Sequence, residues 1–265
     1  MIAGIDHIAL SSGDCGKAVR LMESLGYRLA FSDCGVKNPA IKRDYMTGTC
    51  LFHDLSFLKS EGSLNIEVID HGRVNGRRGS IMPVFENAPR HMFETVGGRE
   101  DMHGESLLNG RFYGSDIHAY FVEGNDGSSH PRTLSRIVVK TPDIARSASF
   151  WSALGFRSVS AGDGFAVLEF GSIMNRDRFL LCLEEATGAP GAWSLDDAGF
   201  NCIALASSSV DRDRETLIMK NGIRPSGIES LTVNGKPLRI FFARGPCGEI
   251  AEIIGIGGKN EKTRE

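Results

Sequence analysis

The sequence predicts an α+β protein made of tandem units, each consisting of one strand, one helix and three further strands. Three observations predict it. An apolar, strand-like run recurs three times, an amphipathic helix pattern follows each copy, and further strand-like runs follow each helix. The recurring runs are GIDHIALSS (residues 4–12), TLSRIVVKT (133–141) and GFNCIALAS (199–207).

The spacing within the three copies is nearly constant. Alignment of the three strands places one residue of each at the same position: His7, Arg136 and Cys202. Each helix pattern ends at a glycine: Gly26, Gly155 and Gly222. The intervals from the aligned residue to the glycine are 19, 19 and 20 residues. Because one such unit buries only one face of its small sheet, we expect the units to pair.

The first unit begins with the strand at 4–12. Its helix is expected within residues 13–29, where four apolar residues have the spacing of a buried helical stripe: Ala18, Leu21, Met22 and Leu25. DLSFLKS (54–60) and SLNIEVID (63–70) have strand composition. The long connection at 33–54, which contains Lys42 to Tyr45, is expected to form a lid or a substrate-selecting loop.

The other two repeats show the same order of elements. Their helices are expected within 142–158 and 208–225. Their last strands are expected at 165–172 and 178–186, and at 236–245 and 248–256.

The segment at 80–130 is interpreted as a shortened fourth unit. SIMPVFEN (80–87) would be its first strand, APRHMFETVGG (88–98) its helix and SDIHAYFVEG (115–124) its last strand, without a full set of strands. Aligned with SLNIEVID, the last strand places His118 opposite Glu67.

Composition and charge narrow the range of functions. Of the 265 residues, 41% are hydrophobic and 24% are charged, the net charge is −3, and the six cysteines are scattered. This pattern indicates a cytoplasmic protein with reduced thiols, without a nucleic-acid or membrane partner. All seven histidines lie between His7 and His130, so any site that needs imidazole takes it from the first half.

These units resemble the βαβββ module of the vicinal oxygen chelate superfamily, which includes glyoxalase I, extradiol dioxygenases and bleomycin resistance proteins. The resemblance rests on IDHIAL, on the Leu-Gly-aromatic ending of two of the helices, and on GPCGEIAEIIG (245–255). The last is similar to the D-P-x-G-x-x-x-E motif of that superfamily, with Gly245 where Asp is usual. The resemblance covers residues 1–72 and 133–256.

The resemblance implies that modules pair into cupped, half-barrel mixed sheets with helices on the outside, around a divalent metal. It implies an N-terminal glyoxalase-like domain at 1–130 (modules 1–72 and 80–126) and a C-terminal one at 131–257 (modules 133–186 and 198–256). Residues 258–265 are expected to be a disordered tail. Exchange of modules between chains, which would give a homodimer, stays open.

The resemblance also implies that the metal ligands come from the first and last strands of the modules. The first-strand positions are His7, Arg136 and Cys202, and the last-strand positions are Glu67, Cys182 and Glu252. An Arg guanidinium stays protonated and cannot ligate a metal. Only the first module keeps both an imidazole and a carboxylate at these positions, and the segment at 80–130 places His118 opposite Glu67. The resemblance therefore implies His7, Glu67 and His118 as ligands, with His53 as a competing third ligand. Glu252 and Tyr120 are the candidate catalytic residues.

Two histidines and one carboxylate favour Fe(II) or Mn(II), and Zn(II) also fits. The function expected is that of a metal-dependent enzyme acting on a small molecule with adjacent oxygens, either a glyoxalase-like lyase or isomerase or a ring-cleaving dioxygenase. Arg136 and Cys202 depart from the extradiol pattern, in which the C-terminal pair carries histidine at both positions. The alternatives are a metal-free protein that sequesters a small molecule, and a structural or regulatory dimer.

Overall fold

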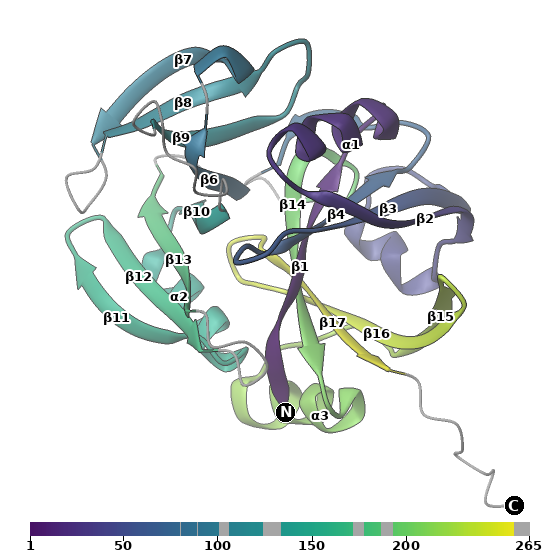
Figure 1. Ribbon diagram of the computed structural model, residues 1–265. Helices are drawn as coiled ribbons and strands as arrows, with labels where there is room; N and C mark the ends of the chain where they lie inside the picture. The colour runs from purple at the N-terminus through teal and green to yellow at the C-terminus, as the bar shows by residue number, and fades with distance from the viewer. Residues whose placement is uncertain are drawn as a thin grey trace, which may run out of the picture.

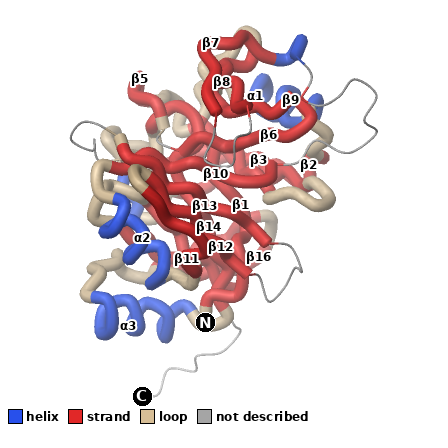
Figure 2. Tube along the Cα trace, turned by 90° about the vertical axis from the view of Figure 1, so that its left-hand side faces the viewer, coloured by secondary structure: helices blue, strands red, loops and turns tan. Residues whose placement is uncertain are grey.

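The computed structural model of the chain describes residues 1–79, 81–88, 90–100, 106–123, 134–171, 178–186 and 193–256. It contains two curved mixed β-sheets, which lie side by side in Figure 1. Helices flank the strands, as Figure 2 shows for α2 and α3. The predicted α+β architecture of strand–helix–strand units is confirmed. The expected tail at 258–265 lies outside the described residues.

The first sheet combines the first and last units, in the order β15-β16-β17-β14-β1-β4-β3-β2. Its strands from the first unit are β1 (Ile2–Ser11), β2 (Arg28–Lys37), β3 (Phe52–Lys59) and β4 (Asn65–Asp70). Its strands from the last unit are β14 (Asp197–Ser207), β15 (Glu229–Val233), β16 (Lys236–Arg244) and β17 (Ile250–Ile256). The short β5 (Asn75–Arg78) pairs with β14.

The second sheet combines the two middle units, in the order β11-β12-β13-β10-β6-β9-β8-β7. The first of these units supplies β6 (Ile81–Ala88), β7 (Phe93–Glu100), β8 (Ser106–Phe112) and β9 (His118–Glu123). The other supplies β10 (Leu134–Thr141), β11 (Arg157–Gly162), β12 (Phe165–Gly171) and β13 (Arg178–Glu185).

This nested pairing corrects the expected division into domains at 1–130 and 131–257. The antiparallel neighbours at the centre of the first sheet are β1 and β14, so the first unit pairs with the last and not with its neighbour in sequence. The corresponding strands β6 and β10 pair in the second sheet. The first strands of two units pair through backbone hydrogen bonds, which do not depend on the side chains. The apolar pattern of a first strand therefore does not show which other first strand it pairs with.

Three helices form where the repeat predicts them: α1 (Cys15–Ser24), α2 (Ile144–Ala153) and α3 (Val210–Asn221). The Asp14 side chain accepts a hydrogen bond from the Lys17 backbone N at 2.8 Å, and Asp143 caps α2 through Arg146 N at 2.9 Å. The predicted glycines follow the helices with positive φ angles: 90° at Gly26, 104° at Gly155 and 64° at Gly222. A left-handed residue there ends a helix at little cost only when it lacks Cβ.

The fourth unit departs from its prediction in two ways. It has four strands, a full set, and the helix expected at 88–98 is reduced to the 3₁₀ turn η2 (Arg90–Met92). β7 takes the rest of that segment. Thr95 and Val96 favour a strand over a helix, and the Gly97–Gly98 pair destabilises a helix.

The largest hydrophobic core is shared by the two sheets and contains residues from all three helices. A second cluster fills the concave side of the second sheet: Val84, Leu107, Tyr120, Val138, Val167 and Cys182. The concave side of the first sheet is instead hollow, and it contains the site described below.

Gly245 makes room for a buried carboxylate near β17. A Cβ at this position would clash with Glu249 Oε2. The Glu249 carboxylate accepts hydrogen bonds from the Ser147 hydroxyl and from Cys247 N. Glu249 thus places a carboxylate beside the position where the superfamily motif usually has Asp.

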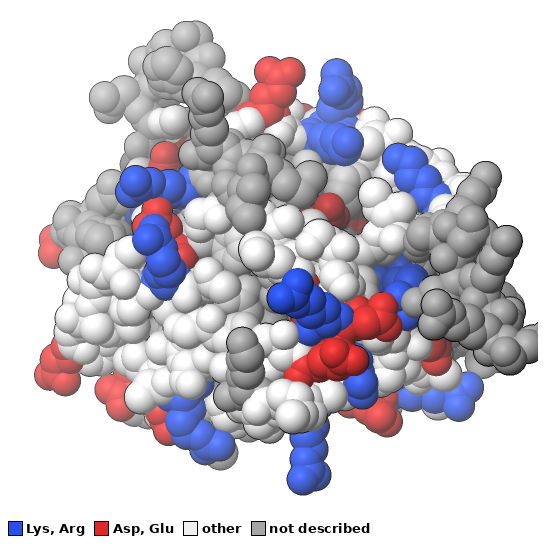
Figure 3. All heavy atoms as spheres, turned by 90° about the horizontal axis from the view of Figure 1, so that it is seen from below, with Lys and Arg blue, Asp and Glu red and all other residues white. Residues whose placement is uncertain are grey.

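The surface carries charges of both signs. Figure 3 shows Lys and Arg beside Asp and Glu on the face seen from below. Arg239 on β16 pairs with Asp211 on α3 at 2.5 Å, and the chain amino group pairs with Asp213 at 2.8 Å. Among the described helices, none has the length and apolar character needed to cross a membrane.

Candidate metal centre

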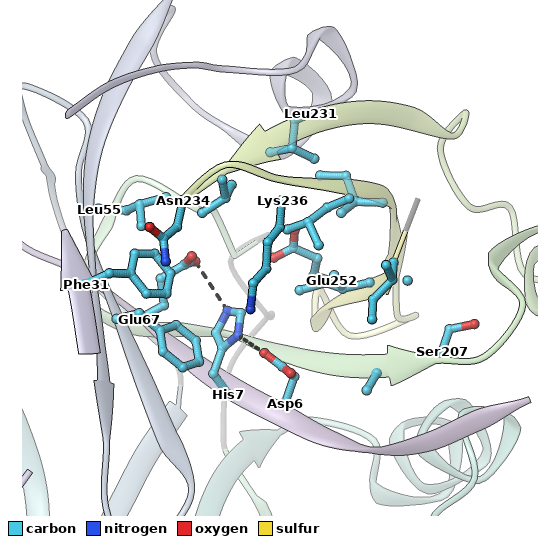
Figure 4. A pocket seen from close by; sticks show the side chains of 18 of the residues that line it. Asp6, His7, Phe31, Leu55, Glu67, Ser207, Leu231, Asn234, Lys236 and Glu252 are labelled. Carbon is cyan, nitrogen blue, oxygen red and sulfur yellow. Dashed lines mark hydrogen bonds and ion pairs between the residues drawn. The ribbon is translucent and has the colours of Figure 1, made fainter. Parts of the chain in front are cut away.

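The first sheet curves around a cavity of about 620 Å³. Its edge strands β2 and β15 approach each other, where Val36, Leu55 and Val233 form a small apolar cluster. Asn234 N also donates a hydrogen bond to Asp33 Oδ2 at 2.9 Å across these edges. The sheet therefore forms an almost closed barrel, with apolar walls and polar residues near its centre (Figure 4).

Three potential metal ligands meet near the centre of the cavity. One ligand atom each of His7, Glu67 and Glu252 lies within 4.8 Å of the other two. The residues come from β1, β4 and β17, and β1 and β4 are neighbours, as are β14 and β17. The register explains the convergence, because Ala9 pairs with Glu67 and Ala204 with Glu252 while His7 lies opposite Ala204.

Asp6 fixes the orientation of the His7 ring. Its Oδ2 lies 2.8 Å from His7 Nδ1 (Figure 4). The register of β1 against β14 shifts between Ile5 and His7, so Asp6 is the extra residue of a β-bulge. Bulges re-aim side chains beside active sites, and here one lets two consecutive residues meet on the cavity side. A carboxylate on Nδ1 leaves Nε2 available as a metal ligand.

His7 Nε2 is buried and has no partner in hydrogen-bond geometry. Glu67 Oε2 lies 3.3 Å away, at ion-pair distance. A buried ring nitrogen that has only this ion-pair contact, without a well-formed hydrogen bond, is costly. A cation between the imidazole and the two carboxylates would remove that cost.

The charges of the cluster depend on one another. Burial alone would lower the pKa of His7, but the Glu67 charge and the hydrogen bond to Asp6 outweigh it and raise that pKa well above its usual value. Burial alone would raise the pKa of Glu67, but His7 lowers it to about 2. Burial raises the pKa of Glu252 to about 7, and the negative charge of Glu67 acts in the same direction. The cluster therefore holds more carboxylate than a single imidazolium can neutralise.

The residues fit a divalent cation by chemistry and by spacing. One imidazole nitrogen and two carboxylate oxygens are common ligands of divalent first-row metals. Ligand bonds of about 2.0–2.2 Å allow at most roughly 4.4 Å between two ligand atoms. The observed limit of 4.8 Å is close to that separation.

The structure places the predicted site residues in two groups. His7 and Glu67 lie together, as expected, and Glu252, expected to be catalytic, joins them as a third potential ligand. His118 and Tyr120 lie on β9 in the second sheet and do not line this cavity. The expected alignment of His118 with Glu67 was wrong by two residues, because Val84 pairs with Tyr120 as Ala9 pairs with Glu67.

The concave sides of the first and second sheets are called here the first and second cups. In the second cup, the positions equivalent to His7, Glu67, Cys202 and Glu252 carry Met82, Tyr120, Arg136 and Cys182. Arg136 pairs with Glu86 at 3.7 Å, and the Arg99 guanidinium lies 4.7 Å from the centre of the Tyr120 ring. In the first cup, the residue equivalent to Arg136 is Cys202, which is fully buried in the shared core. Burial raises the pKa of its thiol well above the usual value, so the thiol is neutral.

The connection expected to be a lid closes the far end of the barrel. The exposed lining residues Lys59, Lys236 and Ile256 mark the open end. The 3₁₀ helix η1 (Ala40–Tyr45) packs against β16, where the Tyr45 hydroxyl donates to Phe242 O at 3.0 Å. Sequence reasoning missed Asp6 and the role of Lys42, which reaches the cavity from η1. An Asp directly before a strand histidine is the signal that would have identified Asp6.

His53 and His71 form a buried neutral pair beside the cluster, with ring centres 5.8 Å apart. His53 lines the cavity and is not one of the three clustered ligand atoms. Burial, reinforced by the positive charge of Lys42, lowers the pKa of His53 to about 3 and that of His71 to about 4.

This pair predicts a loss of stability in mild acid. Below pH 6.5 the unfolded chain binds protons at both histidines, while the folded chain excludes them until the pH reaches about 4 for His71 and about 3 for His53. Each histidine can lower the free energy of unfolding by up to about 1.4 kcal/mol per pH unit. Urea unfolding with chelator present should show this slope, and the His53→Gln/His71→Gln variant a smaller one. Equal slopes would contradict the assignment.

Comparison with known proteins places the fold. No protein-family model matches the sequence, and no curated protein matches it significantly. Maize glyoxalase I carrying V278E aligns with a TM-score of 0.65 and 14% identity, over 95% of this chain and 92% of the other. A Bacillus subtilis protein proposed to be a dioxygenase aligns with a TM-score of 0.66 and 13% identity, over 97% and 86%. Unmodified maize glyoxalase I gives 0.61 and 12%, over 95% and 92%.

Proposed function

We propose that this chain, which has the fold of the vicinal oxygen chelate superfamily, is a metal-dependent enzyme acting on a small molecule with two adjacent oxygen atoms. One observation carries the proposal. The first cup brings His7, Glu67 and Glu252 together, while the equivalent positions of the second cup carry neither an imidazole nor a carboxylate. Packed side chains occupy the second cup instead, among them Val84, Leu107, Val138 and Val167.

Each residue has a distinct part in this proposal. His7, Glu67 and Glu252 would hold the cation, and Asp6 would keep His7 Nε2 directed at it. A divalent cation bound there supplies Lewis acidity, which favours negative charge on neighbouring substrate oxygens. The barrel walls exclude water and hold the rest of the substrate. The open end, beside Lys59 and Lys236, admits it.

The donor set indicates which metals to test. Glu252 in place of a second histidine makes the set richer in oxygen than the 2-His-1-carboxylate site of Fe(II) oxygenases. Carboxylate ligands suit Mn(II), and imidazole suits Fe and Zn. We therefore place Mn(II) first, then Fe(II), and Zn(II) third, and we favour lyase or isomerase chemistry over ring cleavage.

Metal titration tests the proposal. Chelator-treated protein should bind one Mn(II) or Fe(II) per chain in calorimetry, and saturating metal should raise the thermal midpoint. Restored protein should then turn over a member of a panel of 2-oxo aldehyde adducts, diols and catechols, assayed with and without oxygen. Absence of saturable binding of all three metals would overturn the proposal in favour of a metal-free binding protein, which the apolar walls of the cavity also suit.

A further inference from the structure

Lys42 is a buried cation at the closed end of the cavity. It lies on η1, only 6% of its surface is exposed, and it lines the same cavity as His7, Glu67 and Glu252. Among the described residues, none makes a hydrogen bond or ion pair with its ammonium. Lysine is almost never this buried without a partner, because its charge loses hydration.

The groups around Lys42 do not neutralise it by contact. Its charge is close enough to lower the pKa values of His53, His71, Glu67 and Glu252. Both histidines are neutral, and both carboxylates belong to the proposed metal site. If that site is loaded, the divalent cation engages Glu67 and Glu252, Asp6 stays bonded to His7 Nδ1, and no carboxylate of the cavity is left to contact Lys42.

The rest of the η1 segment holds Lys42 in place. Leu195 N and the Ser194 hydroxyl donate to Tyr45 O, at 2.7 and 3.1 Å. Thr47 donates from its backbone N and its hydroxyl to Asp196, at 2.9 and 2.8 Å. The backbone that carries Lys42 is therefore held by a rigid support, which lowers the cost of using this side chain to bind a ligand.

We propose that Lys42 binds the carboxylate of the substrate, and that the substrate is a small organic acid with an apolar body. The proposal rests on the proposed function only in taking this cavity as the substrate site. The acid enters with its carboxylate first, because the ammonium lies at the closed end and the exposed Lys59 and Lys236 lie at the opening. Lysines at an opening raise the rate at which an anion arrives.

The walls suit a flat apolar body. Phe31 and Phe57 stack with ring centres 5.4 Å apart and an angle of 6° between their planes. Aliphatic side chains complete the wall: Leu55, Leu231, Leu238, Ile240 and Ile254. The volume of about 620 Å³ accommodates a bicyclic ring together with its acid group.

Binding of 1-naphthylacetate and of its neutral amide, 1-naphthylacetamide, tests the proposal by calorimetry. Both forms of the protein, chelator-treated and Mn(II)-loaded, are measured. The full chain should bind the acid about 10- to 100-fold more tightly than the amide, as expected for a charge-assisted hydrogen bond. Lys42→Met should remove this preference and leave the affinity for the amide within about threefold, while Lys42→Arg should retain most of it.

The controls separate the alternatives. Lys37→Met, on the exposed end of β2 outside this cavity, should change neither affinity. Equal affinity for acid and amide, or a preference that survives Lys42→Met, would overturn the proposal, and loss of the preference in Lys236→Met alone would place the anion at the opening. If Lys42→Met fails to fold, Lys42→Gln replaces it. Because the preference is measured in both forms, a chain that binds no metal would still report on Lys42.

Discussion

Replacing Glu67 with glutamine should weaken binding of Mn(II) at least about 100-fold. Loss of groups that only orient a metal ligand typically costs 10- to 100-fold in affinity, and Glu67 is a proposed ligand itself. The substitution keeps the shape of the side chain but removes its charge. It thereby removes one of the two carboxylate charges that would balance the cation.

The series around this variant distinguishes a ligand from a general charge effect. Glu61→Gln changes an exposed carboxylate on the loop before β4 and should leave affinity unchanged. Asp6→Asn should have an intermediate effect of about 10- to 100-fold, because it loosens the His7 ring. Titration calorimetry of the three proteins checks the ranking. Similar affinities for Glu67→Gln and Glu61→Gln would remove Glu67 from the site.

Replacing Trp151 with alanine should lower the free energy of unfolding by about 3–5 kcal/mol. Trp151 is fully buried on α2. Its ring packs edge to face against Phe150 and Phe156, with centres 5.1 and 5.4 Å away. Alanine would leave a large cavity in the core that both sheets share, and packing of this density relaxes only partly.

Urea unfolding measures this loss. Met219→Ala, at a side chain that is 83% exposed on α3, is the matched control and should change stability by less than about 0.5 kcal/mol. Trp151 lies on α2, which packs against strands β11, β12 and β13 of the second sheet and not against the cavity of the first. Folded Trp151→Ala should therefore still bind metal with unchanged stoichiometry. A loss below about 1 kcal/mol would contradict the tight packing of Trp151 in the core.

The repeat was visible in the sequence because its signals are local. Helix caps at Asp14 and Asp143 and left-handed glycines after the helices act within a few residues of the chain. His7 and Glu67 could be placed together for the same reason, since they belong to one unit and adjacent parallel strands. The alternation of Glu67 with Ile66 and Val68 already put the carboxylate on the opposite face from the apolar residues.

The partner of the first unit could not be predicted in the same way. The first strands of the units are similar, and only the tertiary structure determines that β1 pairs with β14. This pairing brings Glu252, and not His118, to His7 and Glu67. The sequence placed Lys42 only within the long connection at 33–54. Its position in the cavity could not be predicted, because the sequence does not indicate which end of the barrel that connection closes. The prediction of a helix at 88–98 was wrong because it relied on the spacing of apolar residues, whereas Gly97 and Gly98 disfavour a helix and the segment forms β7.

The most direct test of the site is a crystal of the chelator-treated protein soaked in Mn(II), with data collected for anomalous scattering. We expect one strong peak per chain, bonded to His7 Nε2 and to carboxylate oxygens of Glu67 and Glu252 at about 2.0–2.2 Å. A peak at other residues, or a cavity without any anomalous peak under saturating Mn(II), would contradict the assignment of these three side chains as a metal site.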